Sequence, residues 1–272
     1  MSKIFIIILC VTIFYLFSLL PRLSNRERMM RYRHSLFAHR GYHNAQKGIP
    51  ENSMKAFKAA LDHEYGIELD VHLTKDMHLI VFHDDTLDRV CGRPGSIEKM
   101  TLSELQTCRL LNTNERIPLL KDVLSLVNGQ VPLLVELKMP THSLTVCQKT
   151  YDMLKDYKGD YLIQSFNALG LHWFRTHAPE VLRGQLSSRL TKKASKEPWI
   201  LKFFTEHLIS NILGRPDFIS YKLADLPTIE ITLLRLLFHV PLAVWTLRTR
   251  EALKEGVLHY DIQIFEKQDE NY

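Results

Sequence analysis

The pattern of hydrophobic and polar positions along the chain predicts an α/β protein. Residues 67–73 alternate between apolar and polar types, which is typical of a strand with Glu68, Asp70 and His72 on one face. Short apolar runs recur after it, and segments with helical spacing lie between most of them. The candidate strands are residues 36–38, 67–73, 79–82, 133–135, 161–166, 182–187, 218–221, 242–247 and 262–265. Strands that alternate with helices over this length favour a parallel α/β barrel, the TIM barrel.

These nine candidates exceed the eight strands of such a barrel, so one of them is expected outside it or in a hairpin. Residues 67–73 and 79–82 are separated by a polar turn that is too short for a helical crossover. We therefore expect an antiparallel hairpin that turns near Asp76 and brings His83 back towards Glu68. A register change of one residue would alter which faces meet.

Charged residues stand on or directly after several candidate strands. His39 and Arg40 follow the first strand, and Glu136 follows the strand at residues 133–135. Polar residues at the C-terminal ends of barrel strands are where TIM barrel enzymes bind their substrates. Glu68 and Asp70 would be costly to bury in so apolar a strand unless a cation or another partner compensates them. The sequence therefore predicts an enzyme whose site lies at these strand ends.

The N-terminal segment is strongly apolar. Residues 4–20 carry no charge and are apolar apart from Thr12 and Ser18. As a helix this segment would reach roughly 25 Å, about the thickness of the hydrocarbon core of a bilayer. No small-residue cleavage site follows it, so we expect an uncleaved transmembrane anchor over residues 1–22. A secretory signal peptide and a buried helix are the alternatives.

The charges that flank this segment predict an orientation. Only Lys3 precedes it, whereas five arginines follow between residues 22 and 33. The positive-inside rule places the C-terminal side in the cytoplasm, so we expect a single-pass membrane protein with a cytoplasmic catalytic domain. The four cysteines show no CxxC spacing or disulfide framework, which agrees with a reducing compartment.

The composition is that of a globular protein with a large core. The chain has 272 residues, of which 46% are hydrophobic and 24% charged. The formal charge of +5 is modest and much of the positive charge is N-terminal, so no nucleic-acid partner is expected. We expect an anchor over residues 1–22, a basic juxtamembrane linker over residues 23–35 and a barrel over residues 36–272. The sequence leaves the oligomeric state open.

One further segment has an apolar stripe. Residues 199–213 have the spacing of an amphipathic helix. We expect this helix to pack on the barrel, and contact with a membrane near the mouth of the active site is the alternative.

An ordered set of short motifs runs through the predicted barrel. The motifs are His39-Arg40-Gly41, Pro50-Glu51-Asn52-Ser53, Glu68-Leu69-Asp70-Val71, Thr74-Lys75-Asp76, His83-Asp84, Glu136-Leu137-Lys138, Gln164-Ser165-Phe166 and Trp245-Thr246. Together they resemble the glycerophosphodiester phosphodiesterase family from about residue 36 to the end. Two places depart from the family pattern: Met77 replaces a usual glycine, and residues 260–266 differ from the usual last strand.

The resemblance implies a TIM barrel that hydrolyses glycerophosphodiesters to sn-glycerol 3-phosphate and an alcohol with a divalent cation. It implies His39 and His83 as the acid/base pair, Arg40 and Lys138 as phosphate contacts, Glu68, Asp70 and Glu136 as metal ligands, and Glu51 as a supporting residue. Three carboxylates form a hard oxygen site that suits Mg²⁺ or Ca²⁺. Two histidines can take and give protons near neutral pH.

Other functions stay open at this point. A lysophospholipase D or a phospholipase C-like lipid phosphodiesterase would use related chemistry on a lysophospholipid-like substrate. A membrane-tethered lipid-binding protein is the non-enzymatic alternative. The sequence does not decide which histidine is the base, or whether water or an adjacent hydroxyl attacks first. It also leaves the head-group alcohol and the cation undecided.

Overall fold

The computed structural model describes residues 3–192, 194 and 197–266, and these form a closed barrel. Of the 9 strands in its sheet, all but β3 run parallel to their neighbours. The parallel strands are β1 (Ser35–Ala38), β2 (Gly66–Leu73), β4 (Leu133–Leu137), β5 (Tyr161–Ser165), β6 (Arg183–Ser187), β7 (Phe218–Lys222), β8 (Leu242–Leu247) and β9 (Ile262–Phe265). Because β1 pairs with both β2 and β9, the sheet closes on itself. The predicted TIM barrel is confirmed.

The remaining strand, β3 (Leu79–Val81), forms the predicted hairpin with β2. In their antiparallel register Val71 lies opposite Val81 and Leu73 lies opposite Leu79. The Phe82 N–H donates to the carbonyl oxygen of Asp70 at 2.9 Å, just beyond the end of β3. The hairpin therefore returns the chain so that His83 enters the same end of the barrel as the polar residues of β2.

Alternation along the strands separates an apolar interior from a polar rim. Phe37, Leu134 and Leu162 belong to one buried cluster inside the barrel. The residues two positions later on the chain, including His39 and Glu136, point the same way and line a cavity. The pleat of each strand thus places apolar residues at the bottom of the barrel and site residues at its top.

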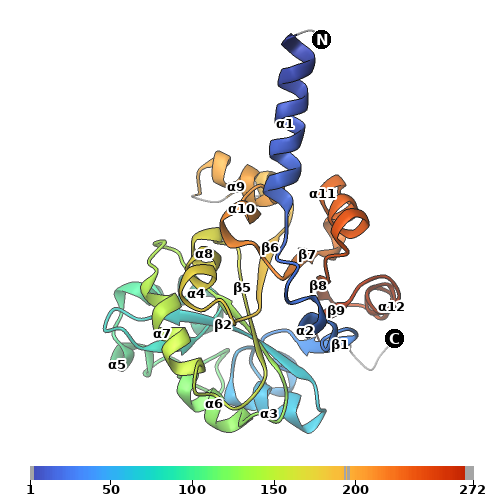
Figure 1. The fold of residues 1–272 in the computed structure, drawn as a ribbon. Helices are drawn as coiled ribbons and strands as arrows, with labels where there is room; N and C mark the ends of the chain where they lie inside the picture. The colour runs from blue at the N-terminus through green and yellow to red at the C-terminus, as the bar shows by residue number, and fades with distance from the viewer. Residues whose placement is uncertain (1–2, 193, 195–196, 267–272) are drawn as a thin grey trace.

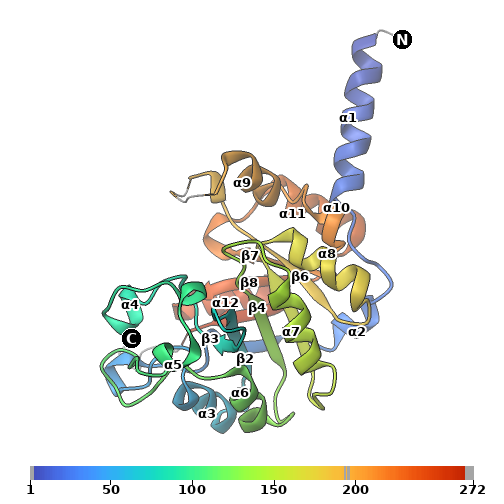
Figure 2. The same cartoon turned by 90° about the vertical axis from the view of Figure 1, so that its left-hand side faces the viewer.

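Helices cover the outside of the strands, as Figures 1 and 2 show for α3, α6, α7 and α8. The longer ones after the first are α3 (Met54–Asp62), α6 (Leu120–Val127), α7 (Thr145–Leu154), α8 (Ala168–His177), α9 (Trp199–Glu206) and α12 (Arg250–His259). The shorter ones are α2 (Arg26–Met30), α4 (Asp88–Cys91), α5 (Leu102–Leu105), α10 (Asn211–Gly214) and α11 (Ile229–Leu233). Ser53 caps the N-terminus of α3, because its hydroxyl accepts the Ala56 N–H at 3.1 Å.

The first helix, α1 (Lys3–Leu19), leaves the barrel and projects away from it (Figure 1). Its base is held by Arg215, whose Nη1 donates to the carbonyl oxygens of Phe17 at 2.7 Å and Leu20 at 2.9 Å. Within the described ranges, no helix combines the length and the apolarity needed to cross a bilayer. The structure therefore does not support the predicted transmembrane anchor over residues 1–22, where the described helix is Lys3–Leu19.

Other predictions about the ends of the chain stay predictions. These are the cytoplasmic location of the catalytic domain and the division at residues 22, 23, 35 and 36. Residues 1–2 of the expected anchor and residues 267–272 of the expected barrel domain lie outside the described part of the chain.

The single helix predicted over residues 199–213 is wrong, because α9 and α10 are separate helices there. Leu208 lies between them with a left-handed backbone (φ 56) and a fully buried side chain. Turning Leu208 into the core requires a conformation that a continuing right-handed helix does not allow. Of the two helices, α10 packs against α8 as expected, whereas α9 has no buried residue.

Candidate active site

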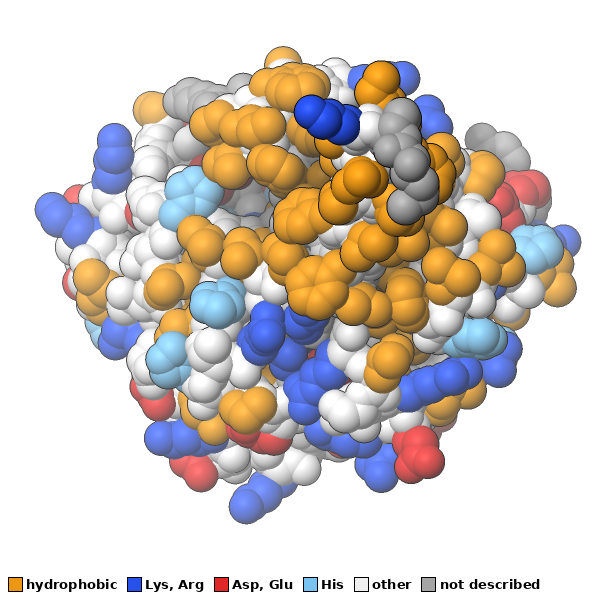
Figure 3. Space-filling model, turned by 45° about the horizontal axis from the view of Figure 1, so that its top comes forward, with side chains coloured by type: hydrophobic (Ala, Val, Ile, Leu, Met, Phe, Trp, Pro, Cys, Tyr) orange, Lys and Arg blue, Asp and Glu red, His pale blue; other side chains and the backbone are white. Residues whose placement is uncertain are grey.

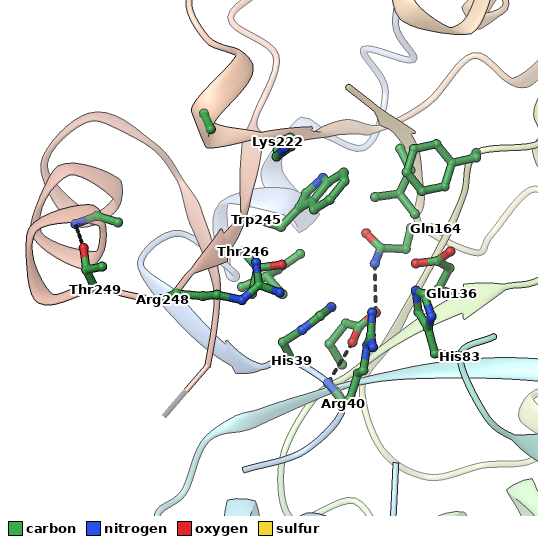
Figure 4. A pocket seen from close by; sticks show the side chains of 16 residues that line it. His39, Arg40, His83, Glu136, Gln164, Lys222, Trp245, Thr246, Arg248 and Thr249 are labelled. Carbon is green, nitrogen blue, oxygen red and sulfur yellow. Dashed lines mark hydrogen bonds between the residues drawn. The ribbon is translucent and has the colours of Figure 1, made fainter. Parts of the chain in front are cut away.

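A cavity of about 580 Å³ opens at the C-terminal ends of the barrel strands (Figure 4). Its lining includes five residues predicted from the sequence, namely His39, Arg40, Glu68, His83 and Glu136. The other three predicted residues, Glu51, Asp70 and Lys138, make ion pairs with members of this set or with each other. The barrel thus brings together all eight predicted site residues.

The turn after β1 delivers His39 and Arg40 into the cavity. The His39 N–H donates to the carbonyl oxygen of Phe265 at 2.8 Å, which extends the pairing of β1 with β9. Gly41 has φ +77, and a Cβ there would lie 2.9 Å from the backbone of Ala56. Only glycine allows that approach. Arg40 also adopts a positive φ of 56, and its N–H donates to Glu68 Oε2 at 2.9 Å.

Three buried carboxylates form the centre of the site. Glu68 and Asp70 on β2 and Glu136 on β4 each offer an oxygen within 4.8 Å of the others. The β2–β4 register places Asp70 directly beside Glu136. Burial, together with repulsion from Asp70 and Glu136, raises the pKa of Glu68 well above its usual range. A divalent cation among three hard oxygen donors would relieve this repulsion, so the residues fit such an ion.

Two positive side chains already compensate part of this negative charge. Lys138 Nζ donates to Glu136 Oε1 and lies 3.0 Å from Asp70 Oδ1. Burial opposes the charge on Lys138, but these two carboxylates outweigh it and raise the pKa of Lys138. Burial likewise opposes ionisation of Asp70, yet Lys138, His83 and Arg40 hold the pKa of Asp70 well below its usual range.

Glu51 positions Arg40 rather than facing the cavity. Its carboxylate accepts hydrogen bonds from Arg40 Nη1 and from two nitrogens of Arg89, all at 2.7 Å. Burial alone would raise the pKa of Glu51, but Arg89 and Arg40 lower it to about 2. Arg89 also binds Asp84, at 2.7 Å from Nε to Oδ2. The chain Arg40–Glu51–Arg89–Asp84 therefore links the turn after β1 to the segment that carries His83.

Each of the two histidines is held by a carboxylate through Nδ1. His39 Nδ1 lies 2.9 Å from Glu266 Oε1, and His83 Nδ1 lies 2.6 Å from Asp84 Oδ1. Such a bond favours the tautomer with the proton on Nδ1, which leaves Nε2 as an acceptor. Burial lowers the pKa of His39 to about 4, although the bond to Glu266 opposes that shift. Figure 4 shows the two imidazoles on either side of Arg40.

The motif analysis missed three charged residues in or beside this cavity. Glu266 follows β9, in the region that departs from the family pattern, and it binds both His39 and Arg248. Arg248 follows β8, and its Nε donates to Glu266 Oε2 at 2.8 Å. Lys222 is the last residue of β7 and lines the cavity. All three stand at C-terminal strand ends, which is the signal that identified His39, and it would have identified them too.

The fold and the site define a TIM barrel protein with a carboxylate cluster flanked by two histidines at the strand ends. A model of the glycerophosphoryl diester phosphodiesterase family matches residues 39–217. The chain therefore belongs to this family, as the motifs predicted.

Curated relatives match part of the chain. A glycerophosphodiester phosphodiesterase of Caldanaerobacter subterraneus is 34% identical over 163 residues, which are 56% of this chain and 65% of that protein. Lysophospholipase D GDPD1 of Rattus norvegicus is 30% identical over 161 residues, which are 54% of this chain and 49% of that protein. The matches thus span between about half and two thirds of these relatives.

Solved structures share the fold along most of the chain. An Oleispira antarctica phosphodiesterase, solved in complex with the product sn-glycerol-3-phosphate, aligns with a TM-score of 0.70 at 22% identity over 87% of this chain and 94% of that one. A glycerophosphodiester phosphodiesterase of Thermotoga maritima aligns with a TM-score of 0.65 at 25% identity over 85% of this chain and 94% of that one.

Proposed function

We propose that this protein hydrolyses glycerophosphodiesters to sn-glycerol 3-phosphate and an alcohol with the help of a divalent cation. The observation that carries the proposal is the cluster of Glu68, Asp70 and Glu136 between two carboxylate-bound histidines in one cavity. Membership of the glycerophosphoryl diester phosphodiesterase family supports it. So does the product bound in the Oleispira antarctica structure, which has the same fold.

The three carboxylates would hold the cation. Their hard oxygen donors suit Mg²⁺ or Ca²⁺, whereas Zn²⁺ favours histidine and cysteine. When bound, the ion polarises a phosphoryl oxygen and stabilises the negative charge that develops there. Arg40 and Lys138 stand beside this cluster, so they bind the remaining phosphate oxygens and keep the diester oriented.

The histidines divide the proton transfers between them. His39 is neutral at neutral pH, because its pKa lies at about 4, and its Nε2 accepts the proton of the attacking nucleophile. Glu266 then stabilises the imidazolium that forms, since it binds Nδ1 at 2.9 Å. His83, which is oriented by Asp84, gives a proton to the leaving oxygen. Glu51 supports the phosphate contact by fixing Arg40.

The direct test is release of glycerol 3-phosphate from glycerophosphocholine, glycerophosphoethanolamine and glycerophosphoglycerol by the full chain. We expect release that EDTA abolishes and that Mg²⁺ or Ca²⁺ restores. His39→Ala and Glu68→Gln should both lose it, the first by roughly 10²–10⁴-fold. The matched controls are His259→Ala and Glu255→Gln, two exposed positions on α12 outside the cavity.

Two outcomes would contradict the proposal. Release that survives EDTA or His39→Ala would remove the roles given to the cation or to the base. Tight binding of the cation without hydrolysis of any of the three diesters would favour a binding protein instead.

A further inference from the structure

A second cavity, of about 450 Å³, lies beside the catalytic cavity and is almost entirely apolar. We call it the apolar groove and define it by Phe14, Leu169, Leu201, Phe204, Ile209 and Leu213. These residues come from α1, α8, α9, α10 and the link between the last two. Figure 3 shows hydrophobic side chains gathered over the face from which α1 emerges. The groove is therefore built from several segments that meet only in the folded chain.

The apolar groove adjoins the catalytic cavity at Phe166, which lines both. Phe166 follows β5 directly, two residues after Gln164, whose side-chain amide donates to Glu68 Oε1 at 3.4 Å. Its ring packs edge-on against Trp245 of the catalytic cavity, with centroids 5.9 Å apart. One aromatic ring therefore separates the catalytic cavity from the groove, so a ligand that occupies both would lie against Phe166.

The exposure of these apolar side chains indicates a ligand-binding site. Leu169 is 45% exposed, Leu201 44%, Leu213 39% and Phe204 38%, all around one depression. Contiguous apolar surface of this kind is costly in water, at about 25 cal/mol per Å², and commonly marks a binding site. Among the described lining residues only Glu197 and His142 are titratable, so the groove suits a hydrocarbon and not a charged group.

The two cavities together select an amphiphile. The catalytic cavity carries Arg40, Lys222 and the carboxylate cluster, which suit a phosphodiester with a cation. The groove offers room for one hydrocarbon segment directly beside it. We propose that the apolar groove binds the single acyl chain of a lysophospholipid whose phosphodiester lies in the catalytic cavity.

This inference rests on the proposed function and names a substrate class for the same site. In the reaction a water oxygen forms a new bond to phosphorus, and the bond from phosphorus to the head-group oxygen breaks. One proton of the water ends on the head-group alcohol. From lysophosphatidylcholine the products are therefore an acylglycerol phosphate and choline, without any oxidant or further reactant.

The test compares palmitoyl-lysophosphatidylcholine, below its critical micelle concentration, with glycerophosphocholine, using the full chain and Mg²⁺. Leu201→Glu places a charge in the groove at an exposed helix position, so the fold should tolerate it. We expect kcat/KM for the lysophospholipid to fall roughly tenfold, because the chain would desolvate that charge, and kcat/KM for glycerophosphocholine to stay within about twofold. Leu258→Glu on α12, which is 76% exposed and lines neither cavity, is the matched control and should change neither value.

Acyl-chain length supplies a second measurement that does not depend on one variant. In the unsubstituted protein kcat/KM should rise from a hexanoyl to a palmitoyl chain, and Leu201→Glu should flatten that rise. Equal effects of Leu201→Glu on both substrates would overturn the inference. So would a length dependence that appears only above the critical micelle concentration, which would indicate docking on a lipid surface.

The two proposals fail in different ways. Hydrolysis of glycerophosphocholine without hydrolysis of the lysophospholipid would overturn the acyl-chain site alone. Failure on both substrates, with the cation present, would overturn the proposed function itself.

Discussion

The mouth of the barrel has a charged side, which is the catalytic cavity, and an apolar side, which is the apolar groove. The two sides differ in the interactions that hold their side chains. On the charged side, Glu68 and Asp70 are almost completely buried and joined to arginine and lysine by directional bonds. On the apolar side, Leu201 and Phe204 are more than one third exposed and make no directional bonds through their side chains. Directional bonds fix atoms to the precision that phosphoryl chemistry needs, whereas apolar contact tolerates many chain positions.

Asp70→Asn, on the charged side, is expected to cause the largest loss of activity. The change removes one proposed ligand of the cation and leaves the buried Lys138 with a weaker partner. We expect kcat/KM for glycerophosphocholine to fall on the order of 10³-fold, because several kcal/mol of charge stabilisation is lost. Ile209→Ala, the matched change on the apolar side, should leave this value within about twofold. If both variants are folded by circular dichroism and lose kcat/KM to a comparable extent, the distinction between the charged and the apolar side is wrong.

A smaller effect on activity is expected from Glu266→Gln. The direction in which this change shifts the pKa of His39 follows from the contacts of that histidine. His39 must be neutral to act as a base, so activity is lost as the pH falls through its pKa of about 4. The bond to Glu266 raises that pKa against the larger effect of burial, so removing the charge should lower the pKa further. The acid limb of the profile of kcat/KM against pH should therefore move to lower pH. The rate at neutral pH should fall roughly tenfold, because the imidazolium loses a charge-assisted bond.

A profile that moves to higher pH would show that Glu266 does not act on His39 in this way. The matched control is Glu255→Gln, which should leave the limb in place. The measurement is kcat/KM for glycerophosphocholine from pH 3.5 to 8 at saturating Mg²⁺, with the stability of each variant followed over the same range.

The smallest effect is expected from Lys222→Met, on the charged side. Lys222 lines the catalytic cavity, and no ion pair to it is found among the described residues. A partly exposed cation of this kind contributes up to about 1 kcal/mol to binding an anion, so KM should rise about fivefold. We expect kcat to change less than KM, since the bond is made equally to the bound diester and the transition state. Lys254→Met on the exposed side of α12 should change neither, and a fall in kcat alone would give Lys222 a different role.

Much of the architecture was predictable from the sequence because it depends on local periodicity. The alternation in residues 67–73 predicted β2, and the short turn after it predicted the antiparallel β3. The order of His39, Glu68 and Glu136 at strand ends predicted that they meet, because parallel strands of a barrel end on one rim. The roles assigned to these residues stay proposals until they are tested.

The features that the sequence did not predict depended on contacts between segments far apart in the chain. Apolarity alone suggested an anchor at residues 1–22, but it did not indicate that Arg215, nearly 200 residues away, holds the base of α1. The burial of Leu208 divided residues 199–213 into two helices. Glu266 became a partner of His39 only through the closure of β9 on β1.

The sequence by itself thus determined the strands, their order and the chemistry at their ends. Only the tertiary structure decided which carboxylate holds which histidine and that Phe166 joins a charged cavity to an apolar groove. The physical reason is that strand periodicity is encoded in neighbouring residues. The groove arises where α1, α8, α9 and α10 leave apolar side chains uncovered, and that depends on how all four pack together.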